Sequence, residues 1–232
     1  MRRTAHRLPF PILFEDDDII VIDKPVGLLT THTKVWGRAA REAQVTAENL
    51  LNDYVRKGQL KSRKRVWLVH RLDRETSGVM MFAKSEAVSE FFRNDWNRLT
   101  EKTYLARVAG ELEAEEGVFE SWLQEDPDGY KVRSVPPPKP SRLPKPSQPP
   151  AKLARTSWRR LSVERGTTLV EVKLHSGRKN QIRVHFSEAG HPVIGDEKYG
   201  GEKASRMYLH AHELKLAVPR YPQPFRAEIG WK

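Results

Sequence analysis

The chain has 232 residues, carries 41 Lys and Arg against 30 Asp and Glu for a formal net charge of +11, and contains no cysteine. The lack of cysteine excludes disulfide scaffolds, thiolate zinc sites and cysteine nucleophiles, and the apolar runs are much shorter than the about 20 residues of a membrane-spanning helix. We therefore expect a soluble, cytoplasmic protein of one or two domains whose natural partners are polyanions.

The first predicted elements are a strand and a helix. Residues 18–27 form an apolar run that ends in a Pro/Gly turn, which is typical of a buried strand. Apolar residues between positions 47 and 55 recur at helical spacing, with Thr46 as a candidate N-cap and Gly58 as a candidate stop.

The middle of the chain predicts two strands, over residues 66–70 and 79–84, on either side of a polar turn. A second helix begins near Ser85 and places apolar residues up to Leu99 on one face. Further strands are predicted over residues 103–110, 118–123, 153–161 and 168–174. A shorter helix near residue 182 ends at Gly190, so the fold class is mixed α/β or α+β with a large sheet.

One segment is not expected in the core. Residues 136–150 hold eight of the sixteen prolines and no acid, which favours an extended, solvated loop. The loop could be a ligand for a proline-reading domain, but its three basic residues favour contact with phosphates. These residues are Lys139, Arg142 and Lys145.

The basic residues are clustered. No acid occurs between Gly129 and Val163, whereas nine Lys or Arg do, and a second cluster runs from Arg56 through residues 61–65. An even distribution would indicate a merely basic, soluble protein. The clusters instead predict an interface for RNA or DNA.

Familiar catalytic motifs are absent from the sequence. It has no GxxxxGK[ST], GxGxxG or GxSxG pattern, so nucleotide-binding and serine-hydrolase functions lack support. His210 and His212 lie at strand spacing, where they could bind a metal, but no third ligand stands close to them in the sequence. We expect structural histidines and no metal.

The polar turn over residues 70–78 is the strongest candidate for chemistry. Asp, Thr, Ser and Gly are ordinary in a surface hairpin, which is the simplest interpretation. However, Asp73 lies between Arg71 and Arg74, whose charges favour its ionised form. A carboxylate on a rigid, basic turn can act as a nucleophile or a base toward an anionic substrate.

This turn, HRLDRETSG, closely resembles the catalytic loop of the RluA-type pseudouridine synthases, whose pattern is HRLDxxTSG. Further segments resemble that family in the same order, over residues 16–29, 101–110, 176–185, 190–200 and 209–214. The resemblance implies an α+β fold with a large mixed, mainly antiparallel sheet flanked by helices. It also implies a single catalytic domain over residues 12–232, without the S4 domain that precedes it in many relatives.

The resemblance implies a role for three residues. Asp73 is expected to be the catalytic aspartate that isomerises uridine to pseudouridine without metal, ATP or organic cofactor. Tyr104 is expected to stack on the flipped uracil, and Arg183 to pair with Asp73; without the resemblance they would be a core tyrosine and a helix-surface arginine. The expected RNA-binding residues are His70, Arg71, Arg74, Thr76, Arg178, Asn180 and Gln181.

Two departures from the family pattern stand near the C-terminal motif. Asn180 occupies a position where the family usually has His, and Ser176 replaces a common Thr. Because Asn can still form hydrogen bonds, we expect activity to survive with altered detail in the pocket.

Two alternatives remain. A non-catalytic RNA-binding or ribosome-assembly module would show the same charge pattern, but it would not need Asp73, Tyr104 and Arg183. A synthase of the RsuA branch would have GRLD in the loop, and His70 argues against it. The expected substrate is structured rRNA or tRNA, and we expect a monomer that needs no protein partner.

Overall fold

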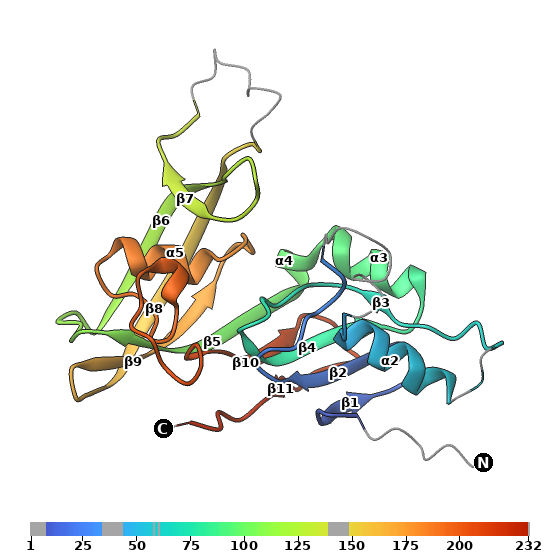
Figure 1. Cartoon of the computed structure of the whole chain (residues 1–232). Coiled ribbons are helices and arrows are strands. Elements are labelled where there is room, and N and C mark those ends of the chain that lie inside the picture. The colour runs from blue at the N-terminus through green and yellow to red at the C-terminus, as the bar shows by residue number, and fades with distance from the viewer. Residues whose placement is uncertain (1–7, 34–43, 58, 60, 139–148, 232) are drawn as a thin grey trace. The chain divides into compact units, whose positions relative to one another are not determined.

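The computed structural model describes residues 8–33, 44–57, 59, 61–138 and 149–231. The chain divides into two compact units (Figure 1). Unit 1 comprises Met1–Thr100 and His210–Lys232, and unit 2 comprises Glu101–Leu209. Unit 1 is therefore built from both ends of the chain.

The sheet of unit 1 is mixed. Its strands, in spatial order, are β1 (Ile12–Glu15), β2 (Ile19–Lys24), β4 (Ser77–Ala83) and β10 (Leu209–Leu216), while β3 (Trp67–Leu68) pairs with β4 and β11 (Phe225–Arg226) with β10. Strand β4 pairs in parallel with β10 and antiparallel with β2 and β3. All seven residues of β4 are buried, so this strand is the centre of the unit.

In the described residues, the helices that accompany this sheet are α2 (Ala47–Arg56), α3 (Glu86–Asn94) and α4 (Trp96–Leu99). The predicted N-cap is confirmed, because the Thr46 side chain accepts a hydrogen bond of 3.1 Å from the backbone N–H of Asn49. The single helix predicted from Ser85 to Leu99 is wrong. It is broken at Asp95, whose φ of −126° is not helical and whose carbonyl begins the next turn.

The described part of unit 2 contains an antiparallel sheet with an α-helix packed on it. The strands, in spatial order, are β5 (Thr100–Ala109), β9 (Thr167–Leu174), β8 (Lys152–Glu164), β6 (Glu116–Glu125) and β7 (Val132–Val135), followed in the chain by α5 (Gln181–Glu188) and the short 3-10 helix η1 (Glu197–Tyr199). Figure 1 shows α5 lying across this sheet, and its Phe186 ring packs edge-on against Phe119 of β6 at 5.1 Å. The predicted α+β class with a mainly antiparallel sheet is confirmed.

Two sequence predictions concern segments with few described residues. Most of the proline-rich segment, residues 139–148 with Lys139, Arg142 and Lys145, lies outside the described residues, as does the predicted helix stop Gly58. Within the part of the chain that the structure describes, no helix is long and apolar enough to cross a membrane.

Candidate active site

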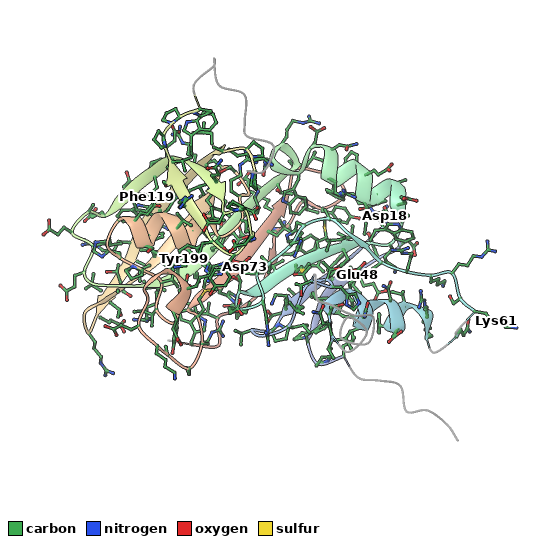
Figure 2. The ribbon with its side chains drawn as sticks, turned by 45° about the horizontal axis from the view of Figure 1, so that its top comes forward. Asp18, Glu48, Lys61, Asp73, Phe119 and Tyr199 are labelled. Atoms are coloured by element: carbon green, nitrogen blue, oxygen red, sulfur yellow. The ribbon has the colours of Figure 1, made fainter. Side chains whose placement is uncertain are left out.

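Asp73 lies on the turn that joins β3 to β4 in unit 1, where its side chain is half-buried. The backbone N–H of Thr76 donates a hydrogen bond of 3.2 Å to the carbonyl of Asp73, which closes the turn over Arg74 and Glu75. Asp73, Glu48 and other side chains are labelled in Figure 2. The chain therefore presents this carboxylate from a defined turn rather than from an extended loop.

Thr30 holds the residue that precedes Asp73. Its Oγ1 donates to the carbonyl of Leu72 at 2.8 Å and accepts from the backbone N–H of Leu72 at 3.3 Å, and Thr30 is 3% exposed. Both backbone groups of Leu72 are thus bound by one buried hydroxyl. This contact fixes the chain on the N-terminal side of Asp73.

Lys24 holds the residue that follows Asp73. Its side chain is fully buried, and Nζ donates to the carbonyls of Pro25, Leu28 and Arg74 at 2.9, 2.9 and 3.2 Å. Arg74 is also bound to Gly27 through both a backbone N–H···O bond of 2.8 Å and an Nε–H···O bond of 3.1 Å. The turn after β2 and the Asp73 turn therefore form one hydrogen-bonded structure.

Gly78 permits a close approach behind the turn. Its φ is +112°, and a Cβ at this position would lie 2.2 Å from the carbonyl oxygen of Ala211 in β10. In the parallel pair of β4 and β10, Ala211 lies opposite Gly78 and His210 opposite Ser77. Only glycine fits this register, so the strand that follows Asp73 is fixed against β10.

The other predicted residues of this turn differ in exposure. His70 accepts a hydrogen bond of 3.0 Å at Nε2 from the Met81 N–H and stacks on Trp96 at 4.5 Å, so its ring is part of the packing of unit 1. Thr76 is 2% exposed, whereas Arg71 and Arg74 are exposed. The two arginines are therefore the cations of the turn that solvent can reach.

Arg183 lies in the first turn of α5 in unit 2 and is 5% exposed. Its Nε and Nη2 donate to the two carboxylate oxygens of Asp196 at 2.6 and 2.7 Å. Its guanidinium carbon lies 5.1 Å from the ring centroid of Tyr199. Arg183 is therefore not a surface residue of the helix. Its partner Asp196 lies within residues 190–200, one of the segments that resemble the family.

Tyr104 lies in β5 of unit 2, opposite Val172 of β9, and is half-buried against the core of this unit. Two residues earlier in the same strand, Lys102 is 8% exposed, and burial lowers the pKa of its ammonium to about 8. Tyr104 and Arg183 thus belong to unit 2, whereas Asp73 belongs to unit 1.

Asn180 occupies the N-cap position of α5 with φ of 52° and ψ of 21°. Asn is one of the few residues that adopt this left-handed conformation readily, which gives a physical account of its presence here. Its Oδ1 accepts hydrogen bonds from Lys198 Nζ at 3.2 Å and from Tyr199 Oη at 3.1 Å. Asn180 therefore connects the start of α5 to η1.

Gln181 and Arg178 connect the same loop to β8. Gln181 is 2% exposed, and its amide accepts from Ser176 Oγ and donates to Thr156 Oγ1, both at 2.8 Å. Arg178 Nε donates to the carbonyl of Leu153 at 3.0 Å. These contacts are internal to unit 2 and hold the loop in place before Arg183.

The positive charge of the acid-free segment between Gly129 and Val163 is partly compensated in the structure by acids from outside the segment. The segment contains no acid, but acids from neighbouring strands and turns lie beside each of its described arginines. These ion pairs are Arg133–Asp126 at 3.4 Å, Arg155–Glu120 at 3.5 Å, Arg159–Glu171 at 3.3 Å and Arg160–Glu115 at 3.8 Å. Neighbouring acids therefore partly compensate the charge of these arginines, and an RNA interface at this segment stays a prediction.

Unit 1 contains a polar hollow of about 630 Å³ beside α2. Its lining does not include Asp73 or any other residue of the Asp73 turn. The lining residues are Thr31, His32, Glu48, Asn49, Asn52, Asp53, Arg56 and Arg65.

His210 and His212 both have structural partners. His210 is 3% exposed and contacts Ser77 Oγ at 2.8 Å and the Ala227 carbonyl at 2.9 Å, and His212 contacts the same carbonyl at 2.9 Å. Among the described residues, no group of three or more His, Cys, Asp or Glu is placed to hold a metal ion. Both histidines are therefore hydrogen-bonded within unit 1.

Comparison with known proteins adds independent information. Residues 18–188 match the family model described as RNA pseudouridylate synthase. The chain is 35% identical over 214 residues to the dual-specificity RNA pseudouridine synthase RluA of Vibrio parahaemolyticus, covering 90% of this chain and 78% of that protein. It is 34% identical over 232 residues to the ribosomal large subunit pseudouridine synthase D of Nitrosomonas europaea, covering 94% and 61% respectively.

A solved structure shows the same fold. The human RNA pseudouridylate synthase domain containing 4 superposes with a TM-score of 0.73 at 23% identity, covering 94% of this chain and 88% of that chain. The family match spans residues 18–188 and therefore includes parts of both units.

Proposed function

The chain belongs to the RNA pseudouridylate synthase family and is an isomerase of uridine in RNA, and from this premise we propose that Asp73 is its essential catalytic residue. The proposed substrate is a uridine in an unpaired loop of structured rRNA or tRNA. Similar proteins are named for rRNA or for dual specificity, so the family alone does not choose between these RNAs.

The observation that carries this proposal is the fixation of Asp73 from both sides. Thr30 binds both backbone groups of Leu72, and Lys24 binds the carbonyl of Arg74. A catalytic group must be held within about half an ångström of its productive position, which buried hydrogen bonds to its neighbours achieve. A turn that only connected two strands would not require a fully buried lysine beneath it.

The reaction balances without a redox partner. The bond from uracil N1 to ribose C1′ breaks, the uracil rotates, and a bond from C5 to C1′ forms, while C5 loses a proton and N1 gains one. Asp73 acts either as a nucleophile at C1′ or as a base toward the ribose, and both roles need an ionised carboxylate.

We assign supporting roles to two residues of unit 2. The Tyr104 ring stacks on the flipped uracil, and Arg183 provides the positive charge that orients Asp73. The support for Arg183 is its bidentate pair with Asp196, which fixes the plane of a guanidinium that is only 5% exposed. An arginine held in this way can offer a donor in a constant direction.

The RNA contacts are divided between exposed and internal residues. Arg71 and Arg74 are exposed and are assigned to phosphates or to the gap left by the extruded base. Gln181 is nearly fully buried with its amide hydrogen-bonded inside unit 2, so we assign it to holding the loop before α5 rather than to RNA. His70 likewise supports the Asp73 turn.

The target base must leave its stack before the glycosidic bond becomes accessible. Extrusion costs a few kcal/mol and is cheapest in loops where the base is unpaired. Phosphate contacts from exposed cations offset this cost and give affinity that falls with salt.

The experiment compares Asp73→Asn with Glu75→Gln. Both substitutions neutralise a carboxylate of the same turn, but Glu75 is exposed and has no assigned role. We expect Asp73→Asn to abolish pseudouridine formation on unmodified rRNA and tRNA transcripts while RNA affinity stays within about threefold of wild type. Glu75→Gln should retain turnover.

The same assay separates the rival function. A wild-type protein that binds the transcripts but forms no pseudouridine would support the non-catalytic binding module. Turnover by Asp73→Asn would remove Asp73 from the chemistry. Mapping pseudouridine across rRNA and tRNA in a deletion strain complemented with wild type or Asp73→Asn then identifies the modified position.

A further inference from the structure

An alternating column of aromatic rings and cations leads from the surface of unit 2 to the buried Arg183. Tyr130, in the loop between β6 and β7, is 62% exposed, and Lys198 Nζ lies 4.7 Å from the centroid of its ring. The same Nζ lies 5.4 Å from the Tyr199 ring, which in turn lies 5.1 Å from the Arg183 guanidinium carbon. Tyr199 is labelled in Figure 2, close to α5.

The loop that carries Tyr130 is anchored. Lys179 Nζ donates to Glu125 Oε2 at 2.8 Å and to the carbonyl of Gly129 at 2.5 Å. The backbone N–H of Val132 donates to Tyr199 Oη at 3.0 Å. Residues on both sides of Tyr130 are therefore tied to the segments that precede and follow α5.

The exposed ring of Tyr130 on an anchored loop is suited to binding a partner. A large aromatic ring gains free energy when water is removed from it, but here the loop holds the ring outward. Cation–π contact with Lys198 fixes one side of the ring. The rest of its surface is available for stacking.

The charges beside the ring favour an RNA base as its partner. Lys131 follows Tyr130 and is exposed, and Lys198 adds a second cation. The nearest acid of the loop, Asp128, accepts a hydrogen bond of 2.8 Å from the backbone N–H of Tyr130. The next two acids are paired with cations, because Asp126 lies 3.4 Å from Arg133 and Glu125, at the end of β6, binds Lys179. An aromatic ring among cations is the arrangement by which proteins hold unpaired bases.

We propose that Tyr130 is a stacking platform for an unpaired base of the substrate RNA, one that flanks the isomerised uridine and is not that uridine itself. The proposal rests on the proposed function, which assigns Arg183 to the catalytic site and therefore connects the column to it. The flanking base stacks on the ring while the neighbouring phosphate contacts Lys131. The column then places this base at a fixed position relative to Arg183.

The test measures binding of unmodified tRNA and rRNA transcripts to the full chain over a range of salt concentrations. Tyr130→Ala should weaken binding about 5- to 150-fold, the range corresponding to the loss of one base stack of about 1–3 kcal/mol. Tyr130→Phe and Tyr130→Trp should bind as wild type, because a ring is retained. Phe91→Ala removes another exposed aromatic, 52% exposed on α3 of unit 1, and should leave affinity unchanged.

The salt dependence distinguishes stacking from phosphate contact. Stacking releases no counterions, so Tyr130→Ala should lower affinity without changing the slope of log K against log salt. Lys131→Ala should reduce the magnitude of that slope by about one. The melting temperature of each variant reports whether its fold is intact.

Three results would overturn the proposal. They are wild-type affinity in Tyr130→Ala, loss of affinity in Tyr130→Phe, and a changed salt slope in Tyr130→Ala. The first result would show that the Tyr130 ring does not bind the RNA and would favour a protein as its partner. The second would show that the hydroxyl of Tyr130, and not its ring, makes the contact, and the third would show that the ring acts through phosphate contacts. Because binding is measured without turnover, it remains informative if no pseudouridine is formed, and Asp73→Asn tests the chemistry separately.

Discussion

The carboxylate of Asp196 accepts two hydrogen bonds from the guanidinium of Arg183, and both side chains are almost completely buried. A buried ion pair of this kind contributes modestly as a pair, but removing one partner leaves the other charge without compensation. The pair is therefore a constraint on the direction of Arg183 as much as a source of stability.

Asp196→Ala should lower the free energy of unfolding by about 3–5 kcal/mol, because the Arg183 charge stays buried. Asp196→Asn keeps the shape of the side chain and should lower the free energy of unfolding by less. It should nevertheless lower kcat at least tenfold with little change in KM, because the direction of the Arg183 guanidinium is no longer constrained by a carboxylate. Urea unfolding and steady-state kinetics measure both effects. The control is Asp126→Asn, whose pair with Arg133 is partly exposed to solvent and is expected to contribute at most about 1 kcal/mol.

Thr30→Val removes the hydroxyl that binds Leu72 while keeping the side-chain volume. We expect a loss of about 1–3 kcal/mol in stability from the unsatisfied backbone groups and a fall of at least tenfold in kcat, because Asp73 is held less precisely. Thr31→Val is the matched control, since the Thr31 hydroxyl bonds to Glu48 instead. Equal kcat values in the two variants would contradict the positioning role of Thr30.

Gly78→Ala should destabilise the chain by more than about 2 kcal/mol, because the new Cβ meets the Ala211 carbonyl and the backbone is at φ +112°. Gly166→Ala also places a side chain at positive φ, +71°, but in open space. Its cost should be about 1 kcal/mol. Chemical denaturation of the two variants separates the clash from the backbone strain.

Lys102 should make stability depend on pH. Burial lowers its pKa from 10.5 to about 8, so between these values the unfolded chain holds a proton that the folded chain has released. Stability from this group therefore rises with pH across that window, and the full burial penalty is present below pH 8. Lys102→Met should exceed wild type in stability by roughly 1–3 kcal/mol at pH 7.

The measurement that checks this prediction is the difference in the free energy of unfolding between Lys102→Met and wild type. This difference should shrink as the pH is raised from 8 to 10, as followed by urea unfolding at each pH. Parallel stability profiles for wild type and Lys102→Met would show that the folded and unfolded states bind this proton equally.

Local patterns in the sequence were sufficient for most elements. The helix α2 begins after Thr46 because a hydroxyl that caps the first turn precedes an apolar repeat of helical spacing, and both signals are local. The break between α3 and α4 was not predicted, because apolar spacing continues past Asp95 while the backbone there does not. The helical spacing of apolar residues does not reveal a single residue with a non-helical backbone.

The contacts that support the candidate site are not local. Thr30 meets Leu72 across 42 residues of sequence, and no periodicity connects them. Lys24 could not be identified as a buried residue either, because lysine is almost always exposed. The family resemblance singled out Asp73 and Arg183 as candidates, but the residues that hold them in place could be identified only from the fold.

The division of the chain has a consequence for its synthesis on the ribosome. The segments of unit 2 are translated in one continuous stretch, whereas unit 1 has to wait for His210–Lys232 before β10 can pair with β4. Until then the start of β4, at Ser77 and Gly78, lacks its partner strand, and an unpaired strand segment of apolar or small residues is prone to association with other chains. The strand that completes the scaffold beneath Asp73 is thus translated only after the whole of unit 2, so the nascent chain lacks this support of the Asp73 turn until unit 2 has been synthesised.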